Sequence, residues 1–243
     1  MCRHLGYLGP ARSLHDLLLA PSYSLVRQAY EPRFQQHGRV NVDGFGAGWY
    51  VAGRTNPVRY RRSVPIWSDQ SFASLAPTIC SGCVMGAVRS ATPGFPSDES
   101  GVAPFTHDRW LFSHNGVLHE CHLAWKTLGH RCARVPDTLA AVDSALLFGL
   151  AVSRWSAGAS LGDGLVQVLH DIDAVGGGRL NLLASDGKRL AATRCGDSLF
   201  VRESAESVVI ASEPTDDGST WQTVPANSLV EADQNGVRVT PLP

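Results

Sequence analysis

The chain has 243 residues, of which 44% are hydrophobic and 18% are charged, and its formal net charge is −1. This balanced charge excludes the basic footprint of a nucleic-acid-binding protein. The apolar content is sufficient for a sizeable core, and we expect a single globular domain over residues 1–243.

The apolar patterning argues against a membrane protein or a secreted one. The run Leu17-Leu18-Leu19-Ala20 ends at Pro21, short of the roughly 18 apolar residues that a membrane helix needs. The N-terminus lacks the basic and then apolar segments of a secretory signal. Six cysteines are too few for a disulfide framework at this length. We therefore expect a soluble cytoplasmic protein without a membrane partner.

Cys2 directly follows the initiator methionine, and two interpretations of it compete. Position 2 is often disordered, so the residue there can be incidental. Alternatively, removal of Met1 leaves Cys2 with a thiol and a free α-amine, whose pKa of roughly 7.7–8.0 lets it take up a proton near neutral pH. One residue then carries nucleophile and base together. The opening residues alone do not decide between these interpretations.

Hydrophobic periodicity predicts three helices and six strands along the chain. The helices are expected at residues 13–19, 136–155 and 161–172. The strands are expected at residues 84–89, 110–114, 180–185, 199–202, 208–211 and 237–240. Because the strands are grouped and do not alternate with helices, the pattern favours an α+β fold with mainly antiparallel sheets. A sandwich of sheets flanked by helices would cover all of these faces.

A cluster of cysteines and histidines allows two interpretations. Cys80-Ser-Gly-Cys83 precedes His119, Cys121 and His122, and a zinc site can be drawn from such residues. The spacing fits no common zinc finger, and buried cysteines often pack as small apolar residues. We expect neither a metal nor another cofactor.

The strand predicted at 84–89 delivers an arginine at its end. Arg89 follows a run of small and apolar residues and precedes the polar turn Ser90-Ala-Thr92. Such a guanidinium is well placed to meet an anion, because its fork fits a carboxylate with two parallel hydrogen bonds. An ordinary surface charge is the alternative interpretation.

The strand predicted at 110–114 runs directly into Asn115-Gly116. Asn-Gly is the strongest short signal for a hairpin turn. The segment that follows is only a modest partner strand, and a second interpretation is an oxyanion hole made by the Asn115 amide and the Gly116 N–H. This segment alone leaves both interpretations open.

Asp143 shares a face with Leu139, Leu147 and Leu150 if a helix already runs through residues 136–155. A carboxylate on an apolar face is costly unless it is paired, and the ammonium group of a ligand would serve as its partner. If the helix begins later, Asp143 is an ordinary N-terminal helix acid.

Taken together, these residues form a chemically coherent set. Arg89 would hold an α-carboxylate and Asp143 an α-ammonium, which is a fixed clamp for an amino acid, such as a glutamyl group. Asn115 and Gly116 would stabilise the oxyanion of its γ-carbonyl, and Cys2 would attack the γ-carbon.

With this set, the chain resembles the N-terminal-nucleophile class II glutamine amidotransferases over nearly its whole length. The matching pieces are Met1-Cys2, Gly44–Tyr50, Arg89–Thr92, Ser113–Gly116, Asp143-Ser144 and Val209–Pro214. The resemblance implies a four-layer αββα sandwich, mainly antiparallel sheets, no metal and a small-molecule γ-glutamyl substrate.

The resemblance also implies a role for each motif residue. The nucleophile of the family falls on Cys2, and its oxyanion hole on Asn115 and Gly116. Its ammonium-binding acid falls on Asp143 and its carboxylate-binding arginine on Arg89. In addition, Thr92 falls where such domains often add a contact to the glutamyl carboxylate.

A closer resemblance is to the γ-glutamyl-hercynylcysteine sulfoxide hydrolases of ergothioneine biosynthesis. It is carried by residues 1–10, 41–48 and 87–94. General glutaminase domains commonly read His-x-Arg-Trp-Ala-Thr-His-Gly around the arginine, whereas this chain reads Ala-Val-Arg-Ser-Ala-Thr-Pro-Gly over 87–94. The absent histidines and tryptophan imply a pocket reshaped for a leaving group larger than ammonia. We therefore expect hydrolysis of a γ-glutamyl amide through a Cys2 thioester.

Two other functions and one recognition site remain open from the sequence. The chain could be a free-standing glutaminase subunit that passes ammonia to a separate synthase. It could instead be a binding module that keeps the glutamyl clamp without catalysis. The trimethylammonium of the larger leaving group would favour aromatic faces, for which Trp49, Tyr50 and Trp67 are candidates, with core packing as the alternative for each.

Overall fold

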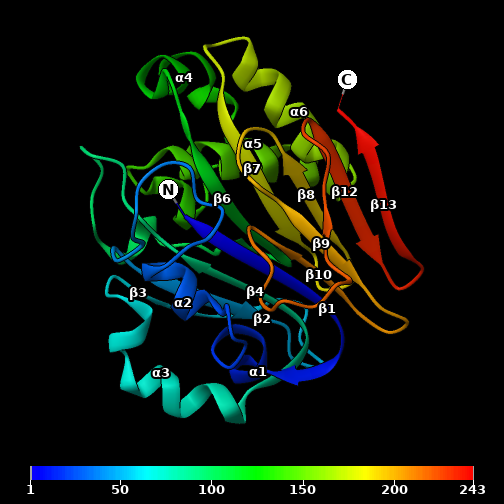
Figure 1. Cartoon of the computed structure of the whole chain (residues 1–243). Helices are drawn as coiled ribbons and strands as arrows, with labels where there is room; N and C mark the ends of the chain where they lie inside the picture. The colour runs from blue at the N-terminus through cyan, green and yellow to red at the C-terminus, as the bar shows by residue number, and fades with distance from the viewer. Residues whose placement is uncertain (1, 243) are drawn as a thin grey trace.

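A computed structural model of the chain describes residues 2–242. These residues form two antiparallel sheets that pack face to face, with helices on both outer sides (Figure 1). The α+β class and the αββα layers expected from the sequence are confirmed. None of the helices in this part of the chain has the length and apolar character of a membrane span.

The first sheet has seven strands and contains the N-terminal strand at its centre. In spatial order it consists of β11 (Gln222–Thr223), β9 (Phe200–Glu203), β10 (Val208–Ala211), β1 (Arg3–Ser13), β4 (Cys80–Val88), β2 (Phe45–Trp49) and β3 (Val58–Arg62). Its outer face is covered by α1 (Leu14–Leu18), α2 (Leu25–Tyr30) and α3 (Gln70–Leu75).

The second sheet has six strands and carries the longest helices on its outer face. In spatial order it consists of β13 (Gly236–Pro241), β12 (Ser228–Asp233), β8 (Leu190–Arg194), β7 (Gly178–Ser185), β6 (Trp110–Leu118) and β5 (Phe105–His107). The covering helices are α5 (Asp143–Ser156) and α6 (Leu161–Asp173), with α4 (Cys121–Leu128) beside them. Short 3₁₀ turns lie at Ile66–Ser68, Ala76–Thr78, Glu99–Gly101, Gly129–Arg131 and Pro136–Leu139.

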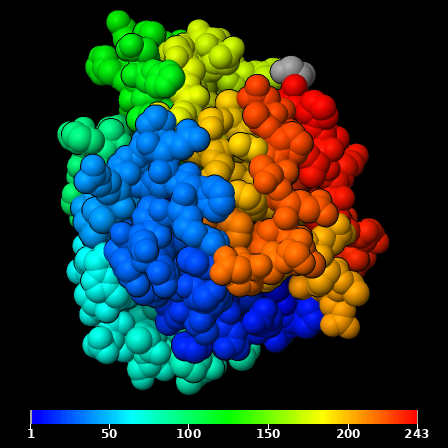
Figure 2. Space-filling model, in the orientation of Figure 1, coloured from blue at the N-terminus to red at the C-terminus, as the bar shows by residue number. Residues whose placement is uncertain are grey.

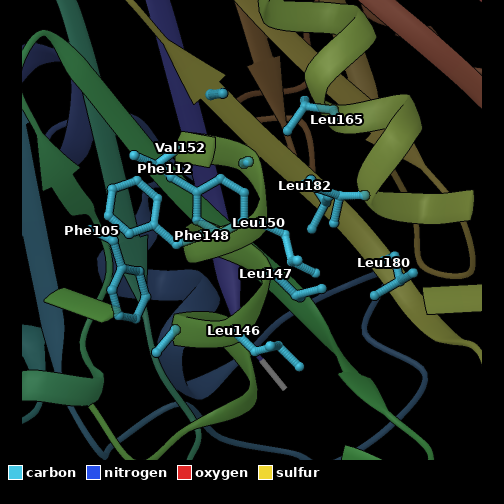
Figure 3. Packing of buried hydrophobic residues seen from close by; sticks show 14 of the residues in the cluster. Phe105, Phe112, Leu146, Leu147, Phe148, Leu150, Val152, Leu165, Leu180 and Leu182 are labelled. Carbon is cyan, nitrogen blue, oxygen red and sulfur yellow. The ribbon is translucent and has the colours of Figure 1, made fainter. Parts of the chain in front are cut away.

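Three buried apolar clusters hold the layers together. The cluster under α5 contains Phe105, Phe112 and Phe148, whose rings lie side by side in Figure 3, and Phe112 stacks on Phe148 with ring centroids 5.6 Å apart. A second cluster joins the first sheet to α1–α3. The third lies between the sheets and includes Met85 and Leu183. Burial of this apolar surface is the main favourable term in folding.

Side chains of β1 alternate between the two faces of the first sheet, and this alternation sets the direction of the Cys2 side chain. Leu5 and Tyr7 pack in the outer cluster. His4 lies within 3.2 Å of Ser113 on β6, and Gly6 lies against Leu183 on β7. Because alternate residues of a strand share a face, the Cys2 side chain also points toward the second sheet.

The N-terminal third of the chain also meets a late segment on the molecular surface. Figure 2 shows the blue N-terminal segments against the orange segment that precedes β12. The amide of Tyr23 donates to the carbonyl of Thr215, and Arg33 binds Asp217 with a 2.7 Å ion pair. These contacts hold the segments before and after α2 against residues 215–217.

One predicted helix begins seven residues later than expected. The sequence predicts a helix from Pro136, whereas the structure has a 3₁₀ turn at Pro136–Leu139, extended residues after it, and α5 from Asp143. The α-helix does not extend back to Asp137, because the Asp137 carboxylate binds Arg59 and accepts a hydrogen bond from the Thr106 amide. Leu139, expected in the core, is 77% exposed.

Candidate active site

A partly open pocket lies where β1 and β4 of the first sheet meet β6 and α5 of the second. It occupies about 480 Å³, including its opening to solvent. Five of the six residues predicted to form a site line it: Cys2, Arg89, Thr92, Gly116 and Asp143. The sixth, Asn115, is fully buried and joins the site through a hydrogen bond with Cys2. The structure therefore brings the whole predicted set together.

The Asn115 amide is held by Cys2 in one orientation. The Cys2 nitrogen donates to Asn115 Oδ1 at 3.2 Å. The other end of the amide, Nδ2, is buried and has no hydrogen-bond partner within residues 2–242. Since an unpaired buried donor is costly, this N–H is available to a bound oxygen atom, as an oxyanion hole requires.

The backbone N–H of Gly116 is not used in the pairing of β6 with β7. The Leu180 amide, opposite Gly116 on β7, donates to Cys195 O at 2.7 Å, on the side away from β6. In an antiparallel ladder such a pair exchanges no hydrogen bonds, so the Gly116 N–H also points away from β7. A Cβ at this position would lie 1.8 Å from the carbonyl oxygen of Arg179. Only glycine fits there.

The hairpin interpretation of Asn115-Gly116 is wrong. Strand β6 continues through both residues and pairs with β7 as far as Leu118. The sequence signal for a turn arises from residue types that the site needs for other reasons: an amide that can bond at both ends, and a position without a Cβ.

Arg89 is fixed at the end of β4 with one nitrogen unused. Its backbone amide donates to Gly44 O at 2.7 Å, and its carbonyl accepts from the Asp43 amide at 2.9 Å. The side chain is buried, and Nη2 donates to the carbonyl of Pro96 at 2.7 Å. Nη1 is buried and lacks a partner in the described chain. A buried guanidinium with a free nitrogen is suited to an anionic ligand.

Thr92 lies in the first turn of the loop that follows Arg89. Its carbonyl accepts a hydrogen bond from the Phe95 amide at 3.0 Å, and both residues line the pocket. Thr92 therefore faces the same cavity as the guanidinium.

Asp143 is the first residue of α5, as the second interpretation of its sequence position held. Its carboxylate is buried, and Oδ2 accepts from the Leu118 amide at 3.2 Å while Oδ1 accepts from the Ser144 amide at 2.8 Å. These backbone donors fix the orientation of the carboxylate at the N-terminus of α5. A carboxylate held in this way can accept further hydrogen bonds from a cationic ligand.

His114 and Ser144 also line the pocket, and neither was predicted as a site residue from the sequence. His114 Nδ1 lies 3.1 Å from Ser144 Oγ, and His114 Nε2 lies 3.0 Å from the Arg179 carbonyl oxygen. Both residues belong to motifs that carried the family resemblance, Ser113–Gly116 and Asp143-Ser144. Their position in these two motifs was the sequence feature that could have indicated a place in the site.

His4 extends the polar contact between the sheets below Cys2. Burial, followed by the positive charge of Arg3, lowers the pKa of His4 to about 3. The ring is therefore neutral at physiological pH, and its Nδ1 pairs with Ser113 Oγ at 3.2 Å. His4 and Ser113 each lie two residues from Cys2 and Asn115 on the same chain segments. Both contacts therefore hold the start of β1 against β6.

The candidate aromatic residues do not line the pocket. Trp49 packs in the outer core of the first sheet, so the packing interpretation holds for it. The Tyr50 hydroxyl is bound to the carbonyls of Arg109 and Ser185. Trp67 is 41% exposed and makes an edge contact with Tyr30.

The cysteines of the CxxC motif do not form a metal site with the downstream residues. Cys83 is buried with its Sγ 3.1 Å from Ser185 Oγ, and Cys80 is exposed. Residues 2–242 contain no group of three His, Cys, Asp or Glu side chains placed to hold a metal ion. The zinc interpretation therefore has no ligand set in this part of the chain.

Similarity to known proteins covers the whole chain. The γ-glutamyl-hercynylcysteine sulfoxide hydrolase of Mycolicibacterium smegmatis is 43% identical, with 100% of both chains covered. The enzyme of the same name from Mycobacterium tuberculosis is 42% identical over 100% of this chain and 97% of its own length. The fold is also that of glutamine phosphoribosylpyrophosphate amidotransferase from B. subtilis, with a TM-score of 0.72, 17% identity, and coverage of 100% of this chain and 49% of that one.

A profile of the family described as glutamine amidotransferases class-II matches residues 18–205. The matched range contains Arg89, Asn115, Gly116 and Asp143, while Cys2 precedes it. The full-length relatives extend the similarity over the N-terminal strand as well. The chain therefore belongs to the class-II glutamine amidotransferase family.

Proposed function

We propose that this protein hydrolyses a γ-glutamyl amide, with γ-glutamyl-hercynylcysteine sulfoxide as its substrate in ergothioneine biosynthesis. The observation that carries the proposal is the hydrogen bond from the Cys2 nitrogen to Asn115 Oδ1, which leaves Asn115 Nδ2 unpaired beside the nucleophile. The substrate assignment draws on two relatives with 42% and 43% identity that bear this enzyme name. The pocket supplies the glutamyl half of the recognition.

The glutamyl group would be held at both ends of its α-carbon. Its carboxylate would bind Arg89 Nη1, which is buried and unpaired in the described chain, with Thr92 nearby. Its ammonium would bind the Asp143 carboxylate. This clamp holds the γ-carbonyl in one position relative to the Cys2 thiol, which lowers the entropic part of the barrier.

Acylation would use the two functional groups of Cys2. Removal of Met1 turns the nitrogen beside Asn115 into an α-amine, which accepts the thiol proton directly or through water. The thiolate attacks the γ-carbon, and Asn115 Nδ2 and the Gly116 N–H stabilise the tetrahedral oxyanion. Loss of one such donor typically costs about 3–4 kcal/mol of transition-state stabilisation.

Acylation ends when the leaving amine departs, and deacylation then repeats the proton transfers with water as the nucleophile. The ammonium of Cys2 first gives its proton to the leaving nitrogen, and the amine departs from a γ-glutamyl thioester. The α-amine then takes a proton from the attacking water. Collapse of the second tetrahedral intermediate returns that proton to the thiolate and releases glutamate.

We further propose one domain over residues 1–243 and a cytoplasmic location. A shared apolar cluster between the sheets supports the single domain. All six cysteines are free, which suits a reducing compartment. The single domain requires one cooperative unfolding transition. The cytoplasmic location requires that the tagged protein be found in the cytoplasmic fraction of cells.

The test of the function is a comparison of two substrates. Protein whose intact mass shows loss of Met1 should release glutamate from γ-glutamyl-hercynylcysteine sulfoxide with a kcat/KM about 100-fold above that for glutamine, because only the former fills the leaving-group side. The Cys2→Ala variant should fold and release none. Preference for glutamine would favour the glutaminase subunit, and a retained Met1 with no turnover would favour the binding module.

A further inference from the structure

The pocket side chains without a role in the proposed mechanism include two that are hydrogen-bonded to each other, His114 and Ser144. Both line the cavity, and His114 is buried in its wall. Ser144 Oγ lies 3.3 Å from Asp143 Oδ1, the carboxylate that would bind the substrate ammonium. Two polar groups beside that carboxylate affect what it can bind.

The Arg179 carbonyl fixes the tautomer of His114. A carbonyl oxygen only accepts hydrogen bonds, so His114 Nε2, 3.0 Å away, carries a proton and donates it. In the neutral ring that proton is the only one. Nδ1 is therefore an acceptor with a lone pair directed at Ser144 Oγ, 3.1 Å away.

Because His114 Nδ1 is an unprotonated acceptor, it determines the direction of the Ser144 hydroxyl proton. A buried acceptor without a donor is costly, and Asp143 Oδ1 already accepts from the Ser144 amide at 2.8 Å. The hydroxyl proton therefore goes to His114. The hydroxyl is also within hydrogen-bond reach of Asp143 Oδ1, 3.3 Å away. When it donates to the closer His114 Nδ1 instead, Ser144 Oγ and Asp143 Oδ1 are neighbouring acceptors with no proton between them.

We propose that Ser144 is a second acceptor for the α-ammonium of the γ-glutamyl group, and that His114 is the positioning residue that keeps its hydroxyl in the accepting state. This inference rests on the proposed function and deepens it. An ammonium group has three donors and can bridge Ser144 Oγ and Asp143 Oδ1, whereas a substrate without the amine leaves the two acceptors facing each other. The pair therefore selects for the α-amine.

The test compares the binding of L-glutamate with that of glutarate, which lacks only the α-ammonium. Titration calorimetry on the wild type should show a preference for L-glutamate. Ser144→Ala should reduce that preference about tenfold, since hydrogen bonds to charged groups contribute more than neutral ones, and should leave glutarate binding unchanged. Ser156→Ala, at the exposed far end of the same helix, is the matched control and should change neither.

Two variants of His114 separate its two hydrogen bonds. Gln places a nitrogen near the Nε2 position and keeps the donor to Arg179, but has no group at Nδ1. Asn places its amide near Nδ1 and keeps an acceptor for Ser144. His114→Gln should therefore lose the preference for L-glutamate as Ser144→Ala does, whereas His114→Asn should keep it within about threefold.

Several results would overturn the inference. They are a wild type without preference for L-glutamate, a Ser144→Ala variant that loses both ligands equally, or a His114→Asn variant that loses selectivity while His114→Gln retains it. Thermal unfolding of each variant checks that the fold is intact. Hydrolysis of the γ-glutamyl substrate by the wild type is scored separately, so failure of the proposed function is distinguished from failure of this inference.

Discussion

The Asn115 side chain offers one acceptor and one donor to the candidate site, and these are two different atoms. Oδ1 accepts from the Cys2 nitrogen at 3.2 Å, and Nδ2 is the buried donor left over. In the proposed mechanism the first contact would place the nucleophile, and the second atom would bind the oxyanion. A substitution that preserves one atom and changes the other separates the two contributions.

Asn115→Asp keeps an acceptor for Cys2 and replaces the donor with a second oxygen. We expect kcat to fall by about 10²–10³-fold, because the oxyanion loses a donor and meets a negative charge. Steady-state hydrolysis of the γ-glutamyl substrate measures this. Activity within tenfold of the wild type would show that Nδ2 does not act on the oxyanion.

His4 couples the strand contact near the nucleophile to pH. Burial, followed by the charge of Arg3, lowers its pKa from an ordinary 6.5 to about 3. Above pH 6.5 the ring is neutral in both the folded and the unfolded chain, and stability is at its full value. Between pH 6.5 and 3 only the unfolded chain takes up this proton, so stability falls as the pH falls.

The size of this effect can be measured against a variant that does not titrate. From pH 7 to pH 5 the wild type should lose about 2 kcal/mol more unfolding free energy than His4→Gln, because the glutamine side chain at position 4 does not titrate while all other groups are shared. Urea unfolding at both pH values gives the difference. Parallel losses in the two proteins would mean that His4 is not held neutral by the fold.

At the scale of elements, Asp137 joins the edge of one sheet to the pocket wall of the other. Its carboxylate pairs with Arg59 and lies 3.6 Å from Arg61, both on β3, and it accepts from the Thr106 amide at 2.7 Å. The Arg61 guanidinium also donates to the Val102 carbonyl at 3.0 Å. These bonds hold the segment that contains the pocket residues Val102 and Ala103.

Loss of this charge should loosen the wall and destabilise the fold. Asp137→Asn leaves two arginines facing each other, and we expect about 2 kcal/mol of lost stability and a raised KM with a smaller change in kcat. Chemical denaturation and steady-state kinetics measure the two effects. The matched control is Glu31→Gln, which breaks an exposed pair with Arg27 and should cost under about 0.5 kcal/mol. Equal losses in both variants would contradict the role of Asp137.

Some elements could be predicted from the sequence and others could not. The helix at Leu161–Asp173 and the strand at Val208–Ala211 follow their patterns closely. Strands β1 and β2 were missed because glycines interrupt their apolar pattern. A Cβ at Gly6 would lie 3.2 Å from a Leu183 methyl, and one at Gly48 would lie 2.8 Å from Leu111. The packing of the two sheets requires these glycines, and a single sequence does not show that packing.

At the scale of the whole molecule, the site is divided between the two sheets. The first sheet brings Cys2 and Arg89 to adjacent strands, and the second brings Asn115 and Gly116 on β6 and Asp143 after it. Catalytic alignment therefore depends on how the sheets pack. Motifs could name these residues, but the direction of the Asn115 amide and the Ser144–His114 contact arise only when β1, β6 and α5 come together.

The central claim is that Cys2 is the nucleophile of a γ-glutamyl amide hydrolase, and acid quenching during turnover tests it most directly. Mass spectrometry of the digested protein should find a γ-glutamyl thioester on the peptide that begins with Cys2, and the Cys2→Ala variant should show neither adduct nor turnover. An adduct on another cysteine, or sustained turnover by Cys2→Ala, would contradict the account.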